Sequence, residues 1–68
     1  MNTFAERLKE LRLEKGWTRK QLAGALLVSV RLISFWENGQ RECNFETLIK
    51  IANLFDASID YLLGRTDF

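Results

Sequence analysis

Residues 18–39 read TRKQLAGALLVSVRLISFWENG, and this stretch decides the fold. Apolar residues at helical spacing predict one short helix over residues 19–26 and another over residues 30–37. The three residues between them, 27–29, predict a tight turn. Asn38-Gly39 is a strong stop and turn signal after the second helix. The stretch therefore predicts two short helices joined by a tight turn.

The apolar residues of this stretch predict how the two helices face the core. In the first helix, Leu22, Ala23 and Leu26 share one face. In the second helix, Ile33 and Trp36 share the inward side. The packing of these two faces against the rest of the chain would fix the angle between the helices.

Capping residues and helical spacing predict three further helices, over residues 3–15, 45–55 and 59–63. The side chains that would cap the five helices are Thr3, Thr18, Ser29, Asn44 and Ser58. In the fourth helix the expected core positions are Phe45, Leu48, Ile51, Ala52 and Phe55. No alternation typical of strands is present, so the chain is predicted to be an all-α, compact five-helix bundle with a single domain, 1–68.

The composition excludes several classes of protein. Histidine is absent and Cys43 is the only cysteine, so neither an internal disulfide nor a Cys/His metal site can form. No residues are evident that would activate a nucleophile, so we expect neither an enzyme nor a cofactor, and no small-molecule ligand is evident. The first residues lack the apolar core of a signal peptide, and no apolar run is long enough for a membrane span. We therefore expect a soluble, cytoplasmic protein without a membrane partner.

The net charge of +1 hides an uneven distribution. Residues 15–41 carry five basic side chains against one acidic, a local net charge of +4. Residues 42–68 carry two basic side chains against five acidic, a local net charge of −3. Such a basic region is what a nucleic-acid interface needs, although an ordinary solvated surface accounts for it equally well.

Four segments in order resemble the Cro and phage-repressor (XRE-type) helix-turn-helix family. They are FAERLKELRLEKGWT (4–18), KQLA (20–23), VSVRLISFWENG followed by QRE (28–42) and FETLIKIANLFDASIDYLLGR (45–65). The resemblance covers nearly the whole chain and implies a lambda-repressor-like DNA-binding fold. It further implies a sequence-specific regulator of transcription, repressor-like, that binds double-stranded DNA as a homodimer and places helix 30–37 in the major groove.

The resemblance also implies which side chains contact DNA. The base-reading residues are Val30, Arg31, Ser34 and Phe35. The phosphate-contacting residues are Thr18, Arg19, Lys20, Asn38, Gln40 and Arg41. An arginine fork can bind guanine O6 and N7 together, whereas Val30 and Phe35 can pack only on a thymine methyl group. Arg12 and Glu37 match a pair that in relatives ties the first helix to the end of the third, although they could also be two unrelated surface charges.

The dimer interface is expected on the last helix, which carries more apolar surface than so short a helix can bury. The residues assigned to it are Ile59, Tyr61, Leu62 and Leu63. The alternative is that this helix simply caps the core. Trp17 and Trp36 are interpreted as core residues rather than as platforms for base stacking, because their neighbours at helical spacing are apolar.

Three departures from the family pattern leave alternatives open. Leu27 stands where the family usually has glycine, and a left-handed leucine costs ~1–2 kcal/mol, which favours a differently built turn. The apolar surface of Val30, Leu32 and Phe35 fits either a thymine-rich site or a protein partner, as in an antitoxin or anti-repressor. Phe35 itself could contact DNA, form an interface or belong to the core. Cys43, in place of a common proline, is interpreted as a loop residue partly buried against helix 45–55.

Overall fold

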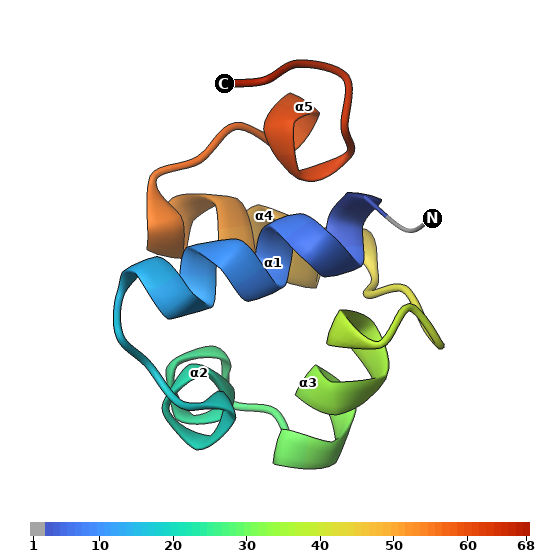
Figure 1. Ribbon diagram of the computed structural model, residues 1–68. Coiled ribbons are helices and arrows are strands. Elements are labelled where there is room, and N and C mark those ends of the chain that lie inside the picture. Colours follow the sequence, from blue (N-terminus) through green and yellow to red (C-terminus); the bar gives the residue numbers. More distant parts are fainter. Residues whose placement is uncertain (1–2) are drawn as a thin grey trace.

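The computed structural model describes residues 3–68, which form five helices and no strand. The helices are α1 (Thr3–Glu14), α2 (Arg19–Leu26), α3 (Val30–Glu37), α4 (Phe45–Phe55) and α5 (Ile59–Leu62). Figure 1 shows α2 and α3 together at one end of the molecule, α5 at the opposite end, and α1 and α4 between them. The predicted all-α bundle is therefore confirmed, with its two-helix unit exposed at one end. No helix within the described part of the chain is long and apolar enough to cross a membrane.

Local capping explains where four of these helices begin. In each of them the predicted side chain accepts a hydrogen bond from the backbone N–H three residues ahead. The capping residues are Thr18, Ser29, Asn44 and Ser58, with donor–acceptor distances of 3.1, 3.1, 2.8 and 2.9 Å. Each bond satisfies an amide that a helix leaves without an internal partner, so the sequence fixes these starts locally.

The core is built from the apolar stripes of all five helices. Its buried members are Phe4, Leu8, Leu22, Ala23, Leu26, Ile33, Trp36, Leu48, Ile51, Ala52 and Leu62. Trp17 packs against this core, with its ring centroid 6.0 Å from that of Phe55. Both tryptophans are thus packing residues, as predicted from their spacing.

Phe45 lies outside the core, contrary to the prediction from helical spacing. Phe45 is 85% exposed, whereas Leu48 and Ile51 of the same helix are buried. Phe45 is the first residue of α4, and on the helical wheel it lies at the edge of the buried stripe, beside the exposed Ile49. It therefore projects past the core instead of into it.

Arg7 fastens the last residues of the chain to α1. Its Nη1 donates to the carbonyl oxygens of Tyr61 (2.9 Å) and Thr66 (2.7 Å). Its guanidinium also lies 4.1 Å from the centre of the Tyr61 ring, within the range of a cation–π interaction. Sequence spacing gave no sign of these contacts, because they join residues that are far apart in the chain.

Leu27 is held in the left-handed region, with φ 59° and ψ 44°. Its backbone N–H bonds to the Gly24 carbonyl, and the next N–H, from Val28, bonds to the Ala23 carbonyl. The turn is therefore built as an ordinary left-handed helix end, and the expectation of a differently built turn was wrong. The leucine side chain gains little in compensation, because the residue is 87% exposed.

We expect Leu27→Gly to raise the free energy of unfolding by roughly 0.5–1 kcal/mol, because relief of the left-handed strain outweighs the added entropy of the unfolded chain. Urea denaturation with an unchanged m-value would measure the gain. The matched control is Ala25→Gly, at an exposed position inside α2, which should instead cost about 1 kcal/mol. A similar loss from both changes would show that Leu27 is not strained.

Candidate nucleic-acid interface

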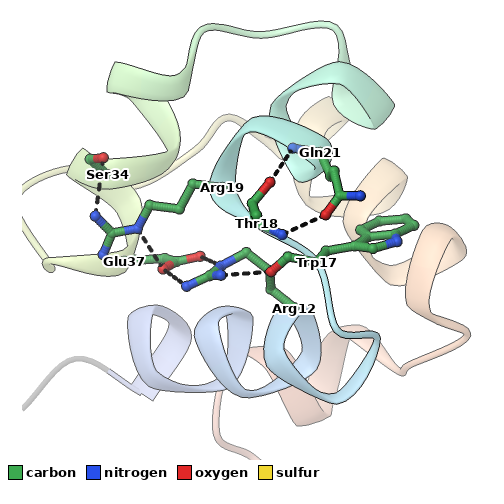
Figure 2. Close-up of polar contacts among 7 residues, drawn as sticks. All are labelled: Arg12, Trp17, Thr18, Arg19, Gln21, Ser34 and Glu37. Carbon is green, nitrogen blue, oxygen red and sulfur yellow. Dashed lines mark hydrogen bonds and ion pairs between the residues drawn. The ribbon is translucent and has the colours of Figure 1, made fainter.

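The carboxylate of Glu37 joins α1, α2 and α3. Its side chain is fully buried at the end of α3. Arg12, from α1, donates from Nε to Oε2 at 2.7 Å and from Nη2 to Oε1 at 3.0 Å. Arg19, from α2, donates from Nε to Oε1 at 3.2 Å (Figure 2). The predicted tie between Arg12 and Glu37 is confirmed as a two-point ion pair, and a second arginine shares its acceptor.

Arg12 also fixes the loop that leads into α2. Its remaining nitrogen, Nη1, donates to the carbonyl oxygen of Trp17 at 2.8 Å, as Figure 2 shows. The guanidinium is thereby bonded at all three nitrogens, and these bonds offset the desolvation cost of burying the cation. No buried side-chain polar atom lacks a partner anywhere in residues 3–68.

The side chain of Arg19 is held by contacts within the protein, which its predicted role as a phosphate contact does not require. Besides Glu37, it contacts Ser34 of α3, with 3.4 Å between Nη1 and Oγ. Its side chain nevertheless remains 35% exposed, and Nη2 has no partner among the described residues. Arg19 and Ser34 thus lie together between α2 and α3, a pairing across two helices that no spacing in the sequence predicts.

The start of α2 presents positive charge to solvent. Thr18 and Gln21 form the predicted reciprocal capping box, with bonds of 3.1 and 2.7 Å (Figure 2). Lys20 follows in the first turn and is exposed. The first amides of a helix carry partial positive charge, so an anion is favoured here by the helix end and by Lys20 together.

The outer face of α3 is smaller and less apolar than its sequence suggests. Val30 and Arg31 are exposed, and Ser34 is half-buried. Leu32 packs against the core instead of joining the outer surface. Phe35 is half-buried and lies within cation–π range of two arginines. Of the four predicted base-reading residues, Val30 and Arg31 are therefore the most accessible.

The segment after α3 folds back along that helix. Asn38, Gln40 and Arg41 are all exposed, as phosphate-contacting side chains must be. The backbone N–H groups of Gln40 and Arg41 both donate to the Phe35 carbonyl, at 2.9 and 3.3 Å. These bonds hold Arg41 near Phe35 of α3, with 5.0 Å between Cζ of Arg41 and the centre of the Phe35 ring.

The predicted dimer surface needs correction. Leu62 is completely buried between α5 and its neighbours, so it belongs to the core. Tyr61 is partly covered by Arg7. Ile59 and Leu63 remain exposed. A four-residue helix can turn only one of two consecutive leucines outward, and spacing alone does not say which one.

Exposed apolar side chains also lie outside α5. Phe45 and Leu63 line one groove, together with Phe4, Leu48 and Cys43. Ile49 lies one turn after Phe45 and is half exposed. The apolar surface near α5 is therefore shared with the start of α4.

Cys43 has the environment of a packing residue. It is half-buried in the loop before α4 and packs against the core, which agrees with its interpretation as a loop residue. Burial raises the pKa of its thiol above the usual value, and the neighbouring Glu42 acts in the same direction, against a backbone hydrogen bond that lowers it. The thiol form is thereby favoured over the reactive thiolate.

Comparison with known proteins agrees with this geometry. A profile of the family described as Helix-turn-helix matches residues 8–62. The chain belongs to this family. The resemblance inferred from the four sequence segments is thus confirmed.

Three similar proteins illustrate the relationship. The HTH-type transcriptional regulator ImmR of Bacillus subtilis is 37% identical over 65 residues, which are 96% of this chain and 51% of ImmR. A transcriptional regulator from Listeria innocua superposes with a TM-score of 0.85 at 38% identity, over 90% of this chain and 57% of the other. The P22 c2 repressor, solved with a synthetic operator, gives 0.83 at 32% identity, over 88% and 91%.

This chain spans about half the length of curated relatives such as ImmR. The matched region of this chain includes the two-helix unit and Glu37. The identity and the superposition over this region support the five-helix fold. The activities of the longer relatives are those of proteins about twice as long as this chain.

We expect Glu37→Gln to lower the free energy of unfolding by about 3 kcal/mol or more, because it leaves the buried Arg12 guanidinium without a counter-charge. Urea denaturation followed by circular dichroism would measure the loss. The control is Arg19→Gln, which breaks only the partly exposed contact and should cost less than about 1 kcal/mol. Equal losses from both variants would mean that Arg12 does not depend on Glu37.

Proposed function

We propose that this chain is a sequence-specific regulator of transcription, repressor-like, that binds double-stranded DNA and reads the major groove with α3. The observation that carries the proposal is the exposed Arg31 at the start of α3. It has no acidic partner among the described residues, and neither has Arg41, whose guanidinium lies near the same Phe35 ring. Cationic groups without internal partners on one side of a helix-turn-helix unit suit a polyanionic duplex.

Each proposed contact follows from side-chain chemistry. Arg31 would donate two hydrogen bonds to guanine, and Val30 would pack on a thymine methyl group. Arg19 and Lys20 would bind phosphates at the start of α2, and Arg41 would bind them after α3. Asn38, Gln40 and Thr18 would add neutral hydrogen bonds to the backbone.

Two further considerations support this function. The P22 c2 repressor, which shares the fold, was solved with a synthetic operator, and ImmR is named a transcriptional regulator. A regulator of this kind works where the DNA is, so we infer a cytoplasmic location. The alternative function, in which the apolar face of α3 binds a protein partner, is less favoured than the sequence alone suggested. Leu32 packs against the core, and two arginines lie near the Phe35 ring, so less apolar surface is left.

We also propose that the chain acts as a homodimer. A single α3 offers one charged base reader, so useful discrimination needs two half-sites about 34 Å apart. Leu63 and Ile59 would form the contact together with Phe45 and Ile49, which are exposed and apolar. Phe45 and Leu63 line one groove, and exposed apolar side chains that lie together are typical of an interface.

We expect Leu63→Asp to weaken self-association while leaving the fold intact, because the side chain is exposed and a charge would have to be buried on pairing. Sedimentation at several protein concentrations would measure it. Leu13→Asp is the matched control, since Leu13 is 56% exposed and Leu63 50%. If the wild-type chain is monomeric at every concentration, or both variants behave alike, this interface is wrong.

Selection of bound duplexes from a random pool tests the function as a whole. We expect the selection to enrich one sequence. We also expect the affinity for that sequence to fall as salt rises from about 50 to about 200 mM, with a linear plot of log association constant against log salt concentration. A protein without a phosphate-binding surface would show neither effect. Failure to bind duplex DNA at the lower salt concentration would overturn the proposal.

Two variants separate base reading from phosphate binding. Arg31→Ala should relax the preference for the selected guanine by roughly tenfold, within the ~1–3 kcal/mol that a bidentate contact provides. Lys20→Ala should weaken binding to all sequences alike and reduce the slope of the salt dependence by about one. Equal effects of both variants on every sequence would remove the base-reading role of Arg31.

A further inference from the structure

Phe35 lies between two arginines that come from different segments. The centre of its ring is 5.5 Å from Cζ of Arg31, one turn earlier on α3. The same centre is 5.0 Å from Cζ of Arg41, in the segment after α3. Both distances lie within the range at which the negative face of an aromatic ring attracts a guanidinium.

The backbone of Phe35 holds the same segment. Its carbonyl oxygen accepts hydrogen bonds from the N–H groups of Gln40 and Arg41. Ring and carbonyl therefore act on Arg41 together, which fixes both the path of the chain and the direction of the side chain. Arg31 is constrained only through the ring, from the neighbouring position four residues earlier.

Neither guanidinium has another partner. Within the described residues no carboxylate lies within ion-pair distance of Arg31 or Arg41, and no hydrogen bond is made by either side chain. A guanidinium over a ring keeps its N–H groups directed outward in its own plane. The ring is therefore the group that both guanidiniums share, and it accepts none of their N–H hydrogen bonds.

We propose that Phe35 is a positioning residue that holds Arg31 and Arg41 as a pair, so that Arg31 reaches guanine while Arg41 reaches the phosphate backbone beside it. This inference rests on the proposed function. It is an alternative to the interpretation of Phe35 as a reader of thymine methyl groups, because the ring already contacts two guanidiniums. It also explains why α3 carries a phenylalanine beside its only charged base reader.

The first test needs no DNA. In the free wild-type protein, side-chain protons of Arg31 and Arg41 should show ring-current shifts in the NMR spectrum. Phe35→Leu should abolish them, and Phe35→Tyr should retain them. Retention of the shifts in Phe35→Leu would overturn the pairing itself, whatever the protein binds. A normal amide spectrum of each variant would show that the fold is intact.

The second test uses the duplex selected from the random pool. Phe35→Leu should reduce the preference for the guanine read by Arg31 by about three- to tenfold, while Phe35→Tyr should keep it. In an Arg31→Ala background, Phe35→Leu should cause no further loss of base preference. An equal loss in both backgrounds would mean that Phe35 reads bases itself and would overturn the proposal.

Uracil in place of thymine distinguishes the two explanations directly, because it removes only the methyl group. We expect the effect of that replacement to be the same in the wild type and in Phe35→Leu. If it disappears in Phe35→Leu, the ring packs on the methyl group and the inference is wrong. Should Phe35→Leu fail to fold, 3,4,5-trifluorophenylalanine at position 35 keeps the shape of the ring but weakens its negative face, and should produce the same loss of guanine preference.

These outcomes separate the inference from the function on which it rests. If the wild type does not bind duplex DNA but shows the ring-current shifts, the proposed function fails and the arginine pair survives. If the wild type binds a selected sequence and Phe35→Leu matches it in affinity and in guanine preference, the function survives and the inference fails.

Discussion

The shared carboxylate of Glu37 is the constraint on which the arrangement of the helices depends. α2 and α3 contain eight residues each, too few for either helix to be stable alone in water. Burial of Ile33 and Trp36 holds α3 against the core, but apolar contacts are not directional. The ion pair with Arg12 is directional, because both partners are bonded in fixed planes. It therefore selects the orientation in which α3 is held.

The same cluster connects stability to the outer surface. All three guanidinium nitrogens of Arg12 donate hydrogen bonds within the protein. The guanidinium of Arg19 is partly exposed, and its Nη2 makes no hydrogen bond among the described residues. A side chain held at two nitrogens has already lost much of its rotamer freedom before a phosphate arrives. Arg19 therefore links α2 with α3, and under the proposed function it would bind a phosphate with part of its rotamer freedom already lost. Glu37 lies behind it without cancelling the charge of Lys20 or Arg41.

Much of this structure could be predicted from the sequence because it is local. The caps at Thr18 and Asn44 need only the next few residues, and the pair of Arg12 with Glu37 followed from a family pattern. Leu27 shows the limit of that reasoning, since a strained residue is tolerated where packing on both sides fixes the turn. The same applies to α5, where Leu62 and Leu63 are indistinguishable until α1 and α4 are in place.

The unpredicted parts of the site are contacts between segments. The bond of Arg19 to Ser34 crosses from one helix to another, and the approach of Arg41 to Phe35 depends on the turn at Gly39. Only Arg31 and Phe35 carried a usable signal, because four residues on a helix are neighbours. Solvent-exposed Phe45 was misjudged for a related reason. Helical spacing gives the direction of a side chain, but not whether the core extends as far as its end of the helix.

The small number of base-reading groups on α3 bears on the proposed pairing of two chains through the apolar groove by α5. One bidentate arginine discriminates by ~1–3 kcal/mol, while about 10⁶ or more competing sites in a genome require several kcal/mol more. Phosphate contacts raise affinity for every sequence and do not close this gap. Pairing two identical chains doubles the base contacts and makes the second binding event intramolecular. A helix with one charged base reader therefore favours the proposed homodimer, and Leu63 and Phe45 line the apolar groove that such pairing would cover.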